Sequence, residues 1–138
     1  MMAAKQICIA LMILGSAKLA FAETPESIVS GYAAEAVKTT PGFSPSAKRG
    51  QNFFTTEWGV SQKMPNCTVC HSKNLKVGGK HVITDKHIAP LSPAANQERF
   101  TSAAKVEKWF KRNCKEVVGR ECTAAEKADF IQFVIQGE

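Results

Sequence analysis

Cys67-Thr68-Val69-Cys70-His71 is the stretch of this chain that decides its fold. Two cysteines separated by two residues and followed directly by histidine form C-x-x-C-H, the attachment sequence of a c-type haem. Each thiol can bond a vinyl group of the haem, and the adjacent imidazole can reach the iron as its proximal ligand. A zinc site would need a second ligand pair, and a thioredoxin-like redox pair would need a βαβ pattern; the sequence shows neither. The motif therefore predicts one covalently attached haem c.

The first 22 residues have the pattern of a cleaved secretory signal peptide. Lys5 precedes an apolar run over 7–14, and Ala20-Phe21-Ala22 places small residues at both positions that determine cleavage. The run is well short of the ~20 apolar residues that a membrane-spanning helix needs. We therefore expect a signal peptide over 1–22, a monohaem cytochrome domain over 23–138, and a soluble protein exported to the periplasm.

Removal of the signal would also lower the number of cysteines and the net positive charge of the chain. The signal contains Cys8, which leaves Cys67, Cys70, Cys114 and Cys122. It contains two lysines and no acidic residue, so the formal net charge falls from +6 to +4. This mildly basic balance suits an acidic redox partner, whereas no Lys/Arg tract with interleaved aromatics indicates nucleic acid. We expect no nucleic-acid partner.

Helical patterns dominate the rest of the chain, and no β pattern competes with them. Thr24-Pro25-Glu26 has a hydroxyl cap, proline in the first turn and an acid, and Thr123 with Glu126 forms a capping box. Residues 73–86 are rich in lysine and glycine and are expected to form a loop. The sequence predicts an all-α fold of about four to five helices around one haem. The helices expected from these patterns span 25–38, 44–56, 101 to beyond 110, and 123–135.

Ala89-Pro90-Leu91-Ser92-Pro93 is expected to stay extended and to offer carbonyl groups, because proline has a fixed φ and no N–H. The carbonyl of Pro90 is a candidate acceptor for the Nδ1 proton of His71, which would leave Nε2 for the iron. An ordinary proline turn fits the same spacing.

The sixth iron ligand decides whether the iron only carries electrons or also binds small molecules. Three of the four methionines lie in the signal, and Met64 precedes the attachment motif, so no methionine follows it. An electron-transfer cytochrome c would take a thioether from the loop before its last helix. The remaining candidates are His81, His87, the amide of Asn113, a lysine amine or an empty position. His81 or His87 would give a low-spin electron carrier, although both also fit as solvated residues of a lysine-rich loop.

Asn113 precedes Cys114 at the end of a predicted helix, where the missing thioether would be expected. With Cys67 and Cys70 bonded to haem in an oxidising compartment, Cys114 and Cys122 are left to pair with each other. A disulfide over this short loop would hold Asn113 in place. An amide oxygen is a weak neutral ligand that a diatomic molecule could displace. Asparagine also suits a helix end, so spacing alone leaves both interpretations open.

Several segments together resemble the sphaeroides haem proteins, which are oxygen-binding cytochromes c. The resemblance covers about 45–138 and rests on five stretches: Cys67–His71, Ile88–Pro93, Lys105–Cys114, Gly119–Thr123 and Glu126–Asp129. It implies a class I cytochrome c fold, His71 as proximal ligand, Asn113 as displaceable distal ligand and a Cys114–Cys122 disulfide. It further implies a high-spin haem that binds oxygen or nitric oxide, and electron partners that are a dihaem c-type cytochrome and a membrane cytochrome b.

We therefore expect a periplasmic monohaem cytochrome, a monomer or weak dimer, that binds O2, NO or CO by displacing Asn113. Plain electron transfer through His81 or His87 is the alternative. Enzymatic reduction of hydroxylamine, nitric oxide or peroxide is a third hypothesis, although the sequence shows no dedicated acid/base pair near the haem.

Overall fold

The last helix is the element against which the N-terminal half of the molecule packs. The structure, a computed structural model, describes residues 23–136, and the predicted signal peptide over 1–22 lies outside them. In these residues α1 (Pro25–Thr39) and α2 (Ala47–Thr55) both pack on α5 (Ala124–Gln136). The other elements are α3 (Thr68–His71), β1 (Gly79–Lys80), β2 (His87–Ile88), α4 (Ala103–Asn113) and the π-helical turn η1 (Cys114–Val118). The four predicted helices are confirmed, and α3 lies within the attachment motif.

Side-chain caps fix where these helices begin. Thr24 accepts a hydrogen bond from the Ser27 backbone N–H, and the Ser27 hydroxyl interacts in return with the Thr24 backbone N–H. Thr123 and Glu126 form the predicted capping box, each side chain pairing with the backbone N–H of the other. The second helix begins at Ala47 with Ser46 as its cap, three residues later than expected from Ser44. An N-cap side chain satisfies one of the N–H donors that the first turn of a helix leaves free. Ser46 does this by accepting the backbone N–H of Arg49.

A glycine and a buried carboxylate fix the crossing of α2 and α5. A Cβ on Gly50 would lie 2.0 Å from the backbone oxygen of Asp129, so only glycine allows this approach. Asp129 is 5% exposed, and both of its oxygens accept hydrogen bonds from Arg49. It also accepts the backbone N–H of Ser46 at 2.7 Å, which ties the start of α2 to α5. The buried charge is thereby paired and hydrogen-bonded, as its burial requires.

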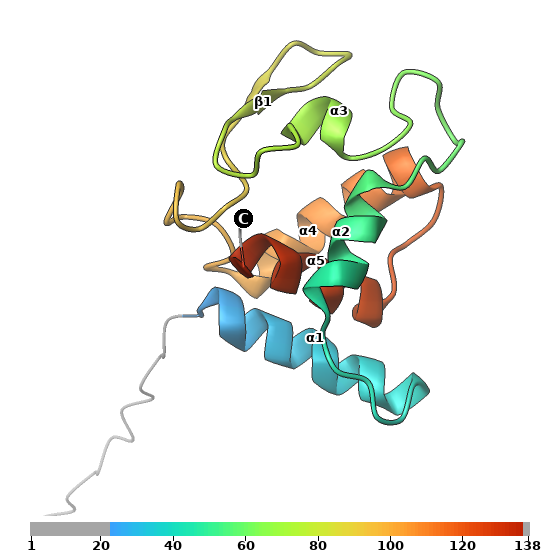
Figure 1. The fold of residues 1–138 in the computed structure, drawn as a ribbon, viewed down its shortest axis with the longest axis vertical. Coiled ribbons are helices and arrows are strands. Elements are labelled where there is room, and N and C mark those ends of the chain that lie inside the picture. Colours follow the sequence, from blue (N-terminus) through green and yellow to red (C-terminus); the bar gives the residue numbers. More distant parts are fainter. Residues whose placement is uncertain (1–22, 137–138) are drawn as a thin grey trace, which may run out of the picture.

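Aromatic side chains from α2, α4 and α5 form the centre of the core. Phe130 of α5 has ring centroids 5.8 Å from Phe54 and 5.6 Å from Phe110, and Phe53 packs at 6.4 Å. Such edge-to-face and tilted pairs add to the stabilisation from burying the rings. These aromatic rings form a layer that faces the attachment motif, and we call this layer the aromatic floor. The attachment motif and α1 lie on opposite sides of the three helices (Figure 1).

A short antiparallel hairpin replaces part of the loop predicted over 73–86. Gly79 pairs with Ile88 and Lys80 pairs with His87, so Gly79 and Lys80 of the predicted loop form a strand instead. A Cβ on Gly79 would lie 1.8 Å from the backbone oxygen of Cys70, which places the hairpin directly against the attachment motif. Two residues per strand are too few for sequence alternation to reveal them. No helix within residues 23–136 is long and apolar enough to cross a membrane.

Candidate haem site

A cavity of about 540 Å³ separates the attachment motif from the aromatic floor. Its wall is formed by α2, α3, α4, η1, α5 and the segment 81–102, which includes β2. The volume falls in the range of sites that enclose a small molecule or cofactor. Cys67, Cys70, His71 and Asn113 all line it, so the structure brings together four residues that are separated by up to 46 positions in the sequence.

The attachment motif presents both thiols and the imidazole to this cavity. Cys67 and Cys70 are half-buried and neither is part of a disulfide. Burial, together with the neighbouring Cys70, raises the pKa of Cys67 to about 12, so its thiol is protonated at neutral pH. Burial, with Arg99 and His81 nearby, lowers the pKa of His71 to about 4. The imidazole is therefore neutral at pH 7, which is the form that binds a metal.

The Nδ1 atom of His71 is buried and has no hydrogen-bond partner among residues 23–136. The carbonyl of Pro90 accepts the Nε–H of Arg99 at 2.8 Å and the side-chain amide of Asn96 at 3.4 Å. These donors already engage both lone pairs of the oxygen. The bond from His71 to Pro90 is therefore absent here and stays a prediction. Arg99 also donates to the carbonyl of Ala89, which makes it the residue that holds this extended segment.

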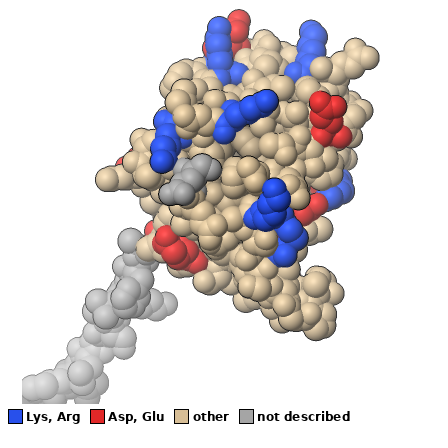
Figure 2. Space-filling model, in the orientation of Figure 1, with Lys and Arg blue, Asp and Glu red and all other residues tan. Residues whose placement is uncertain are grey.

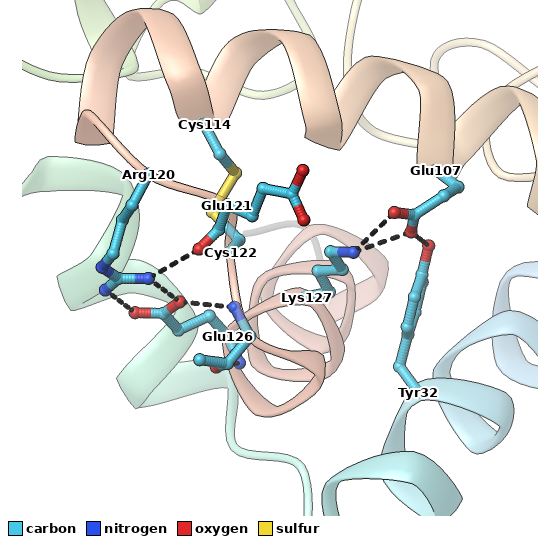
Figure 3. The surroundings of a disulfide bond; sticks show 9 residues. Tyr32, Glu107, Cys114, Arg120, Glu121, Cys122, Glu126 and Lys127 are labelled. Carbon is cyan, nitrogen blue, oxygen red and sulfur yellow. Dashed lines mark hydrogen bonds and ion pairs between the residues drawn. A yellow bond between two sulfur atoms is a disulfide. The ribbon is translucent and has the colours of Figure 1, made fainter.

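Asn113 is the last residue of α4 and lies half-buried on the wall of the cavity. The next residue, Cys114, begins the π-helical turn and is joined to Cys122 by a disulfide with Cα atoms 5.8 Å apart. Figure 3 shows this disulfide beside the start of α5, where Arg120 pairs with Glu126. Farther along α4, Glu107 binds Lys127 of α5 and Tyr32 of α1. Covalent and polar contacts therefore hold the end of the helix that carries Asn113.

His81 and His87 also line the cavity, but their environments differ from that of an iron ligand. The Nδ1 atom of His81 accepts the backbone N–H groups of Ile83 and Thr84 at 3.2 and 3.3 Å. A neutral ring that accepts at Nδ1 carries its proton on Nε2, which leaves no free lone pair for a metal. His87 is exposed on β2. Neither histidine is held in the way that Asn113 is held.

Charged residues that sequence reasoning did not identify also line the cavity. The four cations are Lys86, Arg99, Lys105 and Arg112, and the two carboxylates are Glu98 and Glu116. The resulting formal charge of +2 matches the two propionates of a haem. Arg99 is the half-buried member, and burial lowers its pKa. It forms no ion pair with any residue of the described part of the chain, and no local sequence signal distinguishes it from other arginines.

The cavity thus has two free thiols, a neutral buried imidazole, an aromatic floor and a compensating positive charge. These are the requirements of a covalently bound haem c. When bound, the haem would supply an iron that changes oxidation state and can bind small ligands. Cys67 and Cys70 would hold the haem covalently, and His71 would supply a ligand to its iron.

Comparisons with known proteins agree with this chemistry. Residues 41–134 match the family model described as a domain of unknown function, DUF1924. The chain is 40% identical over 123 residues to the cytochrome c-type protein SHP of Cereibacter sphaeroides, which covers 88% of this chain and 91% of that protein. The chain belongs to the sphaeroides haem protein family. A solved structure of oxidised SHP, described as an oxygen-binding cytochrome c, covers 83% of this chain and 97% of its own at 40% identity and a TM-score of 0.73.

A second relative of this chain is cytochrome c'' of Methylophilus methylotrophus. It is 35% identical over 119 residues, which is 85% of this chain and 83% of that protein. Its oxidised crystal structure aligns with a TM-score of 0.71 at 33% identity. The predictions of the family, of an all-α class I cytochrome c fold and of a haem c cofactor are confirmed. The chain is a monohaem c-type cytochrome.

Proposed function

We propose that this cytochrome works in the periplasm, binds O2, NO or CO at its haem by displacing Asn113, and exchanges electrons with a redox partner. The observation that carries the proposal is the position of Asn113. It lines the cavity that His71 also lines, at a helix end fixed by the Cys114–Cys122 disulfide. Two relatives add support: SHP is described as oxygen binding, and a solution structure of cytochrome c'' is described as giving insight into haem-ligand detachment.

The residues around Asn113 explain why its amide would be displaceable. An amide oxygen is neutral and binds iron weakly, so a diatomic molecule competes with it more easily than with a thioether or a second imidazole. The disulfide keeps the backbone in place while the side chain rotates. Phe110 and Phe130 are buried and give this wall of the cavity apolar surface. Ligand exchange would then require a change of side-chain rotamer and no rearrangement of the fold.

Plain electron transfer with a histidine as sixth ligand is the alternative function. The hydrogen bonds at Nδ1 of His81 disfavour it for that residue, and His87 would have to leave its exposed position on β2. A low-spin reduced spectrum that resists carbon monoxide would support it. For the electron partners we propose a dihaem c-type cytochrome and a membrane cytochrome b, with this chain as a monomer or weak dimer.

Optical spectra of the reduced haem-containing protein test the proposal. We expect a high-spin spectrum that shifts at once when carbon monoxide is added. Asn113→Met should give a low-spin spectrum and slow the shift, because a thioether competes better for the iron. Asn52→Ala, which alters an exposed asparagine of α2 outside the cavity wall, should behave as the wild type. A low-spin, unreactive wild-type protein would contradict the proposal.

A further inference from the structure

The outer face of the hairpin combines exposed apolar side chains with a net positive charge. Of the seven large apolar side chains exposed within residues 23–136, four lie between positions 69 and 83: Val69, Val77, Val82 and Ile83. Residues 69–88 contain four lysines and one aspartate, a net +3 out of the +4 that residues 23–138 carry. We call the exposed side chains of residues 69–86 the hairpin surface. Lysine and arginine side chains stand out from this part of the molecule in Figure 2.

The hairpin surface is directly connected to the haem site. The inner side of the same segment, through His81, Thr84 and His87, forms part of the cavity wall. Gly79 packs against the backbone of Cys70. A protein that docks on the outer face would therefore lie against the same segment that lines the cavity. Electron exchange falls steeply with distance, so this face offers a short path that the α1 side of the molecule does not.

We propose that the hairpin surface is the docking site for an electron-transfer protein whose own docking face has carboxylates around an apolar centre. This proposal rests on the proposed electron exchange and adds where it takes place. The exposed Val82 (41%) and Ile83 (52%) form the apolar centre, and the exposed Lys76 and Lys80, of which Lys80 also pairs with Asp85, provide positive charge. Positive charge of this density steers an acidic partner and repels a second copy of this chain.

A second basic region allows the charge to be separated from the apolar centre. Residues 103–118 of α4 and η1 contain five basic and two acidic residues, which again gives a net +3. This region exposes one large apolar side chain, Trp109, whose neighbours Lys105 and Arg112 also line the cavity. If charge alone selected the docking face, both regions would serve equally. The hairpin surface differs in having its apolar residues at the turn of the hairpin.

Voltammetry of the haem-containing protein on gold tests the proposal without a known partner. The electrode is coated with a mixed monolayer of carboxylate-terminated and methyl-terminated thiols, which imitates the expected partner face. Lys76→Gln/Lys80→Gln should lower the electron-exchange rate about tenfold at low salt. The matched control, Lys108→Gln/Lys111→Gln, removes the same charge from exposed positions of α4 and should lower it less than about twofold.

A second pair of variants tests the apolar centre. Ile83→Ser should lower the rate about fivefold, because half of this side chain would be buried on docking. Val37→Ser removes a similarly exposed side chain from α1 and should leave the rate unchanged. Equal losses at the hairpin and at α4, or no loss at either, would overturn the proposal.

Two further readouts separate this proposal from its alternatives. Carbon monoxide uptake by all four variants should equal that of the wild type, so a failure of gas binding would be seen separately from a failure of docking.

Basic loops with apolar tips also bind anionic lipid. Co-sedimentation with phosphatidylglycerol vesicles that is lost in Ile83→Ser would overturn the proposal by assigning the surface to a membrane. Absence of co-sedimentation with the vesicles would support a protein partner.

Discussion

The two cysteine pairs within residues 23–136 occupy contrasting regions of the molecule. Cys67 and Cys70 lie three positions apart at a single helical turn, keep free thiols and face the cavity. Cys114 begins the π-helical turn and Cys122 follows it; the two are joined to each other and are buried. The first pair fixes the cofactor through local sequence, whereas the second fixes a helix end through the tertiary fold. Under the proposed function, the side of the site that carries Cys67 and Cys70 serves haem attachment and the side that carries Asn113 serves ligand exchange.

The largest expected effect comes from the proximal pair. Cys67→Ser/Cys70→Ser should remove all haem that stays with the polypeptide after denaturation, because no thiol remains to bond it. The measurement is the haem absorbance of the protein after denaturing extraction. Cys114→Ala/Cys122→Ala is the matched control and should keep its haem. Loss of haem in the control alone would reverse the assignment of the two pairs.

The hairpin contact with the motif gives the next effect. Gly79→Ala should destabilise the protein by about 3 kcal/mol, because its Cβ would meet the backbone oxygen of Cys70, which cannot move away cheaply. Urea unfolding measures the change. Gly31→Ala, in an open position on α1, should instead stabilise by up to about 1 kcal/mol. A neutral Gly79→Ala would show that the hairpin does not press on the motif.

On the distal side, Cys114→Ala/Cys122→Ala should lower the free energy of unfolding by about 2 to 3 kcal/mol through the lost chain restriction alone. The two cysteines are 8 positions apart, so the closed loop is short. Urea unfolding with and without reductant measures the loss, and reductant should have no further effect on the variant. A wild-type protein insensitive to reductant and equal to the variant would contradict a stabilising disulfide.

The smallest effect is electrostatic and concerns the support of α4. The hydrogen bond from Lys127, with a second from Tyr32, holds the pKa of Glu107 below its ordinary value of 4.5. Because the folded-state pKa is lowered, this contribution is fully present above pH 4.5 and is lost as the pH falls through the lower folded value. Glu107→Gln should therefore flatten the fall of stability in acid, measured by urea unfolding between about pH 6 and 3.

The control for this prediction is Glu57→Gln. Glu57 is exposed and forms no ion pair with any residue of the range 23–136, so its replacement should keep the wild-type pH profile. Identical profiles for both variants would show that the contact between Glu107 and Lys127 adds nothing to stability. The pair lies partly in solvent, and for that reason we place this effect last.

The regions also differ in how far the sequence predicted them. The haem motif, the capping box at Thr123 and the four long helices were readable because each depends on neighbours in the sequence. The hairpin was missed because two residues per strand leave no alternation. The π-helical turn after Asn113 was missed because the sequence shows no local signal for a fifth residue in the turn.

The charged lining of the cavity was beyond sequence reasoning for a different reason. Arg99 and Glu116 reach the cavity from separate elements, and only the packed fold brings them to one wall. The Pro90 carbonyl, the predicted acceptor for His71, accepts a hydrogen bond from Arg99, a contact that no local sequence pattern indicates. Asn113 was identified because a missing methionine drew attention to its position.

The association rate of carbon monoxide with the reduced protein tests the central claim most directly. If Asn113 occupies the iron until it swings away, removing its amide in Asn113→Ala should speed binding, because the competent state is then always populated. Asn52→Ala, at an exposed position of α2, should bind at the wild-type rate. Equal rates in wild type and Asn113→Ala would show that Asn113 does not compete for the iron and would contradict the account.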